Sequence, residues 1–267
     1  MRIILALDEH GYSADAIAQM ARLGENTWAD ITMLCTVHKL MDGDAIVKSY
    51  LKDFLKFVDR DISPYSQTAP GSAGNNGIQK KIITKVSRDN PVKAILDQAD
   101  IDNADLIAMG CNTKDEYTWK NNGDVPLKVA RAAKCSVLVM KKDKKINKVL
   151  CCLDHDNISQ ESLEMVNQMV TLFDAGLDIV VLTKDDVVKE NIEKKLAWLI
   201  NYYSARKIFP CIELVELRHL EAFVARRARW GLMAMWMGKK SILERVFSGN
   251  KLSRLLKANE SSVLLLR

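Results

Sequence analysis

Several features that would narrow the class of protein are scarce or missing in this sequence. Only 4 of the 267 residues are histidines, which leaves few candidates for acid–base catalysis. No apolar run approaches the length needed to cross a bilayer, and the run in MRIILALD is too short for a signal peptide. We therefore expect a cytoplasmic protein with no membrane partner.

The cysteines lack the spacing of a metal site or of a disulfide framework. The sequence contains no C-x-x-C, and most of the six cysteines lie within apolar runs: Cys35, Cys111, Cys135, Cys151, Cys152 and Cys211. We interpret them as reduced thiols, most of them buried, and we expect no metal site. Cys111, which follows a glycine, is the candidate for an exposed and redox-active thiol.

The charge balance also lacks a strong bias. The 39 basic and 34 acidic residues leave a formal net charge of +5, which argues against a dedicated nucleic-acid surface. Arg226, Arg227 and Arg229 form a local basic stretch before an apolar run. Cations at a helix C-terminus explain this stretch more simply than an anion-binding surface does.

The motifs of several nucleotide-dependent enzymes are absent. The sequence has no G-x-x-x-x-G-K-[S/T] motif, and the segment after the first apolar run, residues 8–13, reads DEHGYS without the paired glycines of an adenylating loop. His10 and His155 lie in polar segments and are expected to be solvated. We predict no catalytic residues, which favours a non-enzyme.

Short apolar runs alternate with amphipathic segments along the first part of the chain. Runs at residues 3–7, 31–37, 82–83, 106–109 and 137–140 predict buried strands, and helical spacing between them predicts helices. Pro91 suits the first turn of a helix, where its missing N–H costs nothing. Strands that alternate with helices predict a parallel, doubly wound α/β sheet.

The same plan then repeats. The run at residues 149–153 ends on Asp154 as residues 3–7 end on Asp8, Ser159 is a candidate N-cap, and residues 231–238 and 263–266 match 104–110 and 137–140. The cluster KKDKK at residues 141–145 has the composition of a solvated linker. We predict two five-stranded domains in a pseudo-two-fold arrangement, residues 1–142 and 146–267.

Residues 104–140 carry the clearest functional pattern. A buried strand ending at Gly110 leads through a polar loop with Gly123 to a helix near Val125, an arrangement that directs backbone N–H groups at phosphates. The simpler alternative is that both glycines are turn residues.

The runs Asp105 to Gly110 and Cys135 to Val139 resemble the last third of a universal stress protein domain, and the repeated plan extends this resemblance to a tandem member with two fused copies. The family's nucleotide loop reads G-x2-G-x9-G-[S/T]. Gly110 and Gly123 match its first and third glycines, while Thr113 and Asp124 replace the middle glycine and the hydroxyl residue. A carboxylate at Asp124 repels phosphate, so the resemblance supports the fold more than it supports ATP binding at this loop.

The resemblance also implies a second loop and further contacts. In the second copy the loop departs from the family pattern, although it includes lysines that suit an anion. Its candidate residues are Gly238, Lys239, Ser241, Gly249 and Asn250. An ordinary surface loop is the alternative. Because this loop has no carboxylate at its phosphate end, it is the better anion candidate of the two. The family places an aspartate beside the nucleoside, here Asp8 or Asp154, and a backbone position beside the base, here Val37. Capping or turn roles remain the alternatives for both aspartates.

The resemblance thus implies a non-catalytic stress-response or signalling protein that binds ATP or AMP, with Mg²⁺ accompanying ATP, or another small anion in one of its domains. The alternatives are a weak ATPase or adenylating enzyme, and a dimerisation module without a ligand. The last strands, residues 137–140 and 263–266, are expected to pair antiparallel within the chain. A homodimer and an unidentified protein partner are further expectations, and no nucleic-acid partner is expected.

Overall fold

The computed structural model describes residues 1–8, 17–23, 29–57, 82–111, 125–141, 146–154, 159–183, 189–227, 231–237 and 261–267. The strands and helices of the first part of the chain are β1 (Arg2–Leu7), a helical segment at residues 17–23, β2 (Asp30–Thr36), α2 (Gly43–Phe57), β3 (Ile82–Ser87), α3 (Pro91–Asp102), β4 (Leu106–Cys111), α4 (Val125–Ala132) and β5 (Ser136–Lys141).

The second part of the chain continues in the same style. Its elements are β6 (Lys148–Asp154), α5 (Gln160–Phe173), β7 (Gly176–Thr183), α6 (Lys189–Ser204), β8 (Cys211–Glu216), the short helix η1 (Leu217–His219), α7 (Leu220–Arg227), β9 (Leu232–Trp236) and β10 (Ser262–Leu266).

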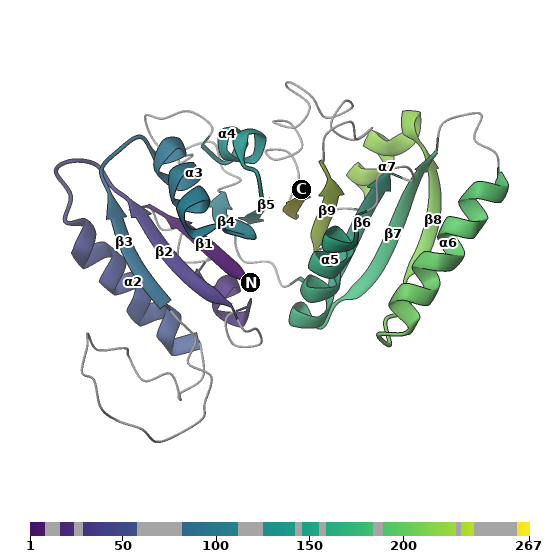
Figure 1. Ribbon diagram of the computed structural model, residues 1–267, viewed down its shortest axis with the longest axis horizontal. Helices are drawn as coiled ribbons and strands as arrows, with labels where there is room; N and C mark the ends of the chain where they lie inside the picture. Colours follow the sequence, from purple (N-terminus) through teal and green to yellow (C-terminus); the bar gives the residue numbers. More distant parts are fainter. Residues whose placement is uncertain are drawn as a thin grey trace, which may run out of the picture.

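The ten strands of the described residues join one sheet in the order β3-β2-β1-β4-β5-β10-β9-β6-β7-β8. Every neighbouring pair is parallel except β5 and β10, which meet antiparallel. We call β1 to β5 the first half of the sheet and β6 to β10 the second half. In Figure 1 the first half lies on the left, the second on the right, and the C-terminus between them.

Helices cover both faces of the sheet, and each face has its own hydrophobic core. The core on one face is built with residues of the segment 17–23, α2, α5 and α6, and the core on the other with residues of α3, α4 and α7. We call these the first face and the second face. The predicted doubly wound α/β fold is confirmed, and the nearly continuous apolar runs of the strands follow from burial on both sides.

Local signals fix the ends of two helices. Asn90 caps α3 by accepting a hydrogen bond of 3.2 Å from the Lys93 N–H, and Pro91 occupies the first turn, as predicted. Ser159 caps α5 in the same way through the Ser162 N–H, also at 3.2 Å, as predicted. Each helix then ends where a residue takes the left-handed conformation, Asn103 at φ 45° and Asp174 at φ 47°.

The contact between β5 and β10 is reciprocal. Leu138 lies opposite Leu264, with Val139 opposite Val263 and Val137 opposite Leu265. The N–H of Lys141 donates to Ser262 Oγ at 3.0 Å, and the N–H of Arg267 donates to Ser136 Oγ at 3.3 Å. In each direction, therefore, the N–H of a basic residue at the end of one strand donates to the hydroxyl of a serine at the start of the other.

Two sequence expectations were wrong in detail. Lys141, which we assigned to the solvated linker, is the last residue of β5 and is 1% exposed, because β4 and β10 flank that strand. Strand β4 does not stop at Gly110 but continues to Cys111, which pairs with Lys141. Residues 142–145, the rest of the expected linker, lie outside the described part. None of the described helices is both long and apolar enough to span a membrane.

Candidate functional site

The strand order reverses at one point in the first half. β1 lies between β2 and β4, and the helices on its two sides cover opposite faces of the sheet. In open α/β sheets, ligands bind where the strand order reverses, outside the carboxyl ends of the strands. For the first half this point is the carboxyl edge of β1 and β4.

Two of the predicted site residues lie near each other at this edge. Ala6 of β1 lies opposite Met109 of β4, so that the next residues along these parallel strands are Leu7 and Gly110, followed by Asp8. Asp8 is 3% exposed and Gly110 is buried. Asp8 follows Leu7, the residue that the extended register places beside Gly110, so the carboxylate and the strand position without a side chain lie one residue apart at the reversal point.

The end of β2 adds the third predicted residue. Thr36 Oγ1 donates a buried hydrogen bond of 3.2 Å to the Leu7 carbonyl, which ties β2 to β1 at their ends. Val37 follows directly, is 7% exposed, and donates its N–H to the Ser87 carbonyl at 3.0 Å. The Val37 side chain also contacts the start of α2, because a Cβ added at Gly43 would lie 2.9 Å from a Val37 methyl group. Val37 is thus a fixed point of this edge.

Sequence reasoning missed Lys141 at the same edge. Its carbonyl accepts a 2.9 Å hydrogen bond from Gln19 Nε2 of the segment 17–23, and its side chain is buried. The available signal was a lysine directly after an apolar run, but a neighbouring cluster of charges made the linker interpretation look simpler.

The second half presents a different set of side chains at its own edge. Asp154 ends β6 opposite Leu182 of β7, and Trp236 ends β9 opposite Leu266 of β10. Only the backbone position of Asp154 is described. Leu182 is fully buried and Trp236 is partly buried against the core of the first face.

The remaining predicted site residues lie outside the described part of the chain: Thr113, Gly123, Gly238, Lys239, Ser241, Gly249 and Asn250. Their assignments stay predictions. The same holds for Asp124.

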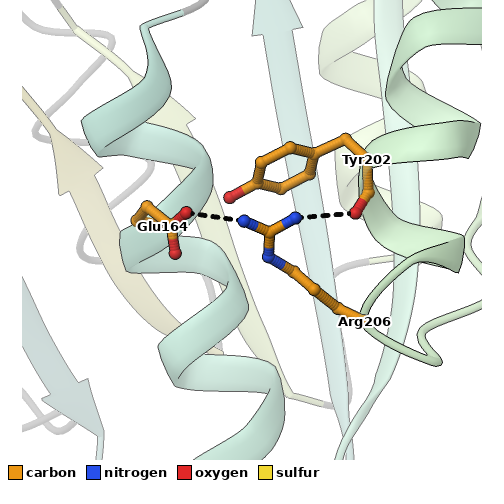
Figure 2. A network of polar contacts seen from close by, with 3 residues as sticks. All are labelled: Glu164, Tyr202 and Arg206. Atoms are coloured by element: carbon orange, nitrogen blue, oxygen red, sulfur yellow. Dashed lines mark hydrogen bonds and ion pairs between the residues drawn. The ribbon is translucent and has the colours of Figure 1, made fainter.

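A polar network between α5 and α6 is structural in character. Figure 2 shows Arg206 between the two helices: its guanidinium donates to Glu164 Oε1 at 2.9 Å and to the Tyr202 carbonyl at 3.0 Å. The guanidinium carbon also lies 3.8 Å from the centre of the Tyr202 ring. Burial, reinforced by the Glu164 carboxylate, raises the pKa of Tyr202 to about 12. The phenol therefore stays neutral at physiological pH, and the network holds the end of α6 against α5.

Burial keeps three of the described cysteines in the thiol form. Burial raises the pKa of Cys152 to about 12 and that of Cys135 to about 11, and it raises the pKa of Cys151 strongly. None of the five described cysteines forms a disulfide with another described residue, although Cys211 is exposed rather than buried as expected. Within the described ranges, no three His, Cys, Asp or Glu side chains are grouped to hold a metal ion.

A cavity of about 240 Å³ lies at the opposite edge of the first half, between the C-terminal ends of α3 and α4. An ion pair of 2.6 Å between Lys134 and Asp100 lies at this cavity, and the half-buried, protonated Cys135 thiol also lines it. Small side chains form much of the remaining wall. The cavity is far from the strand ends that carry Asp8 and Gly110, and it adds no group to that edge.

Comparisons with known proteins find one family model and several similar structures. A family model described as the universal stress protein family matches residues 1–141. A putative universal stress protein from Pseudomonas aeruginosa has a similar structure, with a TM-score of 0.66, 16% identity, and coverage of 99% of this chain and 92% of that one. A universal stress protein from Archaeoglobus fulgidus gives a TM-score of 0.63 at 16% identity, with coverage of 100% and 96%.

The fold also occurs outside that family. The cytoplasmic domain of a prokaryotic cation chloride cotransporter matches with a TM-score of 0.53 at 11% identity, covering 99% of this chain and 94% of that one. At such identities the likeness shows the fold alone. A search among curated proteins finds no match to the chain.

Proposed function

This chain belongs to the universal stress protein family, and we propose that it is a non-catalytic stress-response or signalling protein that binds an adenine nucleotide or another small anion at the carboxyl edge of its sheet. The observation that carries the proposal is the placement of Asp8, Val37 and Gly110 at the ends of three adjacent strands, β2, β1 and β4. The output of the protein is a conformation or a contact with another protein, rather than a reaction product.

Each residue has a role that suits its chemistry. The Asp8 carboxylate accepts hydrogen bonds from ribose hydroxyls, as acidic residues do in related α/β folds. Since the Val37 N–H already donates to Ser87, the carbonyl of Val37 is the group that meets the base. Gly110, with Thr113 and Gly123 from the loop that follows, lets backbone N–H groups approach the phosphates. If ATP is the ligand, Mg²⁺ accompanies it.

Asp124 bears on which nucleotide is bound. A carboxylate close to the phosphate end of the loop disfavours a triphosphate more than a monophosphate, because repulsion grows with the charge of the ligand. AMP is therefore expected to lose less affinity to Asp124 than ATP does. The second-half set, Asp154 with Gly238, Lys239, Ser241, Gly249 and Asn250, is the alternative place for an anion.

The proposal includes two fused copies of one domain, residues 1–142 and 146–267, paired within the chain through their last strands. Support comes from the strand order, which is β3-β2-β1-β4-β5 from one end and β8-β7-β6-β9-β10 from the other. The reciprocal bonds between β5 and β10 also support it. A homodimer, a protein partner and a cytoplasmic location belong to the same proposal.

Titration of the purified chain with ATP and with AMP, with and without Mg²⁺, tests this function. We expect saturable binding without release of phosphate or pyrophosphate. Asp8→Asn should weaken binding by roughly 10-fold or more, since a hydrogen bond to a charged group is lost, while the exposed helix variant Asp97→Asn should bind normally. Turnover would instead indicate an enzyme, and absence of binding would favour an interaction module.

A further inference from the structure

The strand registers define which residues of the two halves correspond. Leu106 of β4 lies between Ile3 of β1 and Ser136 of β5. Leu232 of β9 lies in the same way between Val149 of β6 and Ser262 of β10. Gly110 lies as far along β4 from Leu106 as Trp236 lies along β9 from Leu232. Gly110, which lies opposite Met140, therefore corresponds to Trp236, which lies opposite Leu266.

This correspondence differs from the one that the sequence suggests. Gly238 also ends an apolar run and looks like the counterpart of Gly110, but it lies two residues beyond the structural position. The second half therefore carries the largest side chain at the strand end where the first half carries none.

The side chain of Trp236 has a definite direction. Leu232 and Ala234 belong to the core of the first face, whereas Met233 and Met235 belong to the core of the second face. Trp236 follows this alternation and packs against the core of the first face. In β4, Leu106 and Ala108 belong to that same core, so Gly110 turns its missing side chain toward the same side.

Strand β2 and its counterpart β7, each one strand further away, show the same trend. Cys35 lies opposite Leu7 in the first half, and Val181 lies opposite Leu153 in the second. The next residues therefore correspond: Thr36, whose hydroxyl donates a hydrogen bond to the end of β1, and Leu182. Leu182 is fully buried. Both substitutions replace a small or polar group at the strand ends by a large apolar one.

From this we infer that the chain binds one nucleotide, in the first half, and that the Trp236 indole occupies in the second half the volume that the ligand takes beside Gly110. The inference rests on the proposed function and decides which half performs it. A glycine at a strand end permits close approach of a ligand to the backbone. An indole at the same place has about the size of a nucleobase and removes that approach.

The test counts nucleotides on the full chain by native mass spectrometry with AMP and with ATP and Mg²⁺. The wild-type chain should carry one nucleotide. Trp236→Phe should also carry one with unchanged affinity, because a smaller aromatic ring still fills the second half, whereas Trp236→Ala should carry two. Gly110→Val should carry none, and Gly110→Ala should bind at least about tenfold more weakly, as a 1.4 kcal/mol loss gives a factor of ten.

Circular dichroism and urea unfolding of each variant separate loss of the site from loss of the fold, and Gly110→Ala serves if Gly110→Val does not fold. Three results would overturn the inference and leave the proposed function standing. They are two nucleotides on the wild-type chain, one nucleotide on Trp236→Ala, and binding that is lost with Trp236→Phe but retained in the Gly110 variants. A wild-type chain that binds none would overturn both.

Discussion

Cys151 and Cys152 are neighbours in β6, and both thiols are fully buried on opposite faces of the sheet. Burial raises the pKa of Cys152 from 9.0 to about 12 and raises that of Cys151 as well. A raised pKa means that the folded chain keeps protons that the unfolded chain releases. The stabilisation is complete below pH 9 and is lost as the pH rises above that value.

We therefore predict that the free energy of unfolding falls between pH 9 and pH 11. Each such thiol contributes a slope of about 1.4 kcal/mol per pH unit in this range. Urea unfolding at a series of pH values measures this slope. In Cys152→Ala the slope should be smaller by about 1.4 kcal/mol per pH unit, the contribution of one thiol proton. Identical pH profiles for Cys152→Ala and the wild-type chain would contradict this reading of the thiol.

Tyr203 is fully buried on α6, and its hydroxyl has no hydrogen-bond partner among the described residues. A buried polar group without a partner costs stability, so Tyr203→Phe should leave the free energy of unfolding unchanged or raise it by about 1 kcal/mol. Thermal and urea unfolding at pH 7 measure the difference. A loss of more than about 1 kcal/mol would mean that the hydroxyl is satisfied, for example by a water molecule.

At the scale of the elements, Gly231 fixes the entry to β9. Its φ is +146°, and an added Cβ would meet the Lys148 carbonyl oxygen of β6. We predict that Gly231→Ala lowers the free energy of unfolding by about 3 kcal/mol or more, because steric overlap adds to backbone strain.

Gly176 provides the matched control. It begins β7, the other strand beside β6, and the nearest atom to an added Cβ is 4.0 Å away, with no positive φ. Gly176→Ala should therefore shift the melting temperature only slightly. Equal effects of the two substitutions would show that the Gly231 backbone is not the constraint.

Much of the element pattern was predictable from the sequence because it depends on local chemistry. Pro91 and Ser159 mark helix starts through capping, which a short window of sequence reveals. The end of α3 at Asp102 is less evident from such a window. Its last turn is held by tertiary contacts of Asp102, 2.8 Å from Thr32 Oγ1 and 3.7 Å from Lys85 Nζ, which a local pattern cannot show.

The candidate site was predictable only in part, for a related reason. Asp8 and Gly110 could be placed at one edge because both end buried runs and parallel strands share a carboxyl edge. The correspondence of Gly110 with Trp236 could not, since it depends on strand register and Gly238 offered a more obvious match. Lys141 was assigned to a linker because the burial that β10 imposes on β5 comes from the far end of the chain.

At the scale of the whole molecule, the β5 and β10 pair makes a single ten-stranded sheet out of two halves. Arg267, at the end of β10, extends this contact: its guanidinium donates to the Ala130 carbonyl at 2.8 Å and the Arg131 carbonyl at 3.1 Å, at the end of α4. It also reaches the Met237 carbonyl at 3.4 Å. The two halves are therefore joined by backbone pairing, side-chain packing and a cation at a helix C-terminus.

We predict energetic coupling across the centre of this pair. Leu138 and Leu264 face each other and are fully buried, so each change to alanine should cost about 2–5 kcal/mol. The double variant should deviate from additivity by about 0.5 kcal/mol or more, because the residues are in contact. The pair of Leu5 and Leu264 serves as the additive control, because β4 and β5 lie between their strands β1 and β10. Additivity in both pairs would argue against a tightly packed junction.

Hydrogen–deuterium exchange of the full chain with and without AMP, or ATP with Mg²⁺, tests most directly whether a nucleotide binds at the carboxyl edge of the first half. Binding there predicts slower exchange at the ends of β1, β2 and β4, including Asp8, residues following Val37, and Gly110, with little change at the ends of β6, β7 and β9. Slower exchange confined to the second half, or no change in either half, would contradict it.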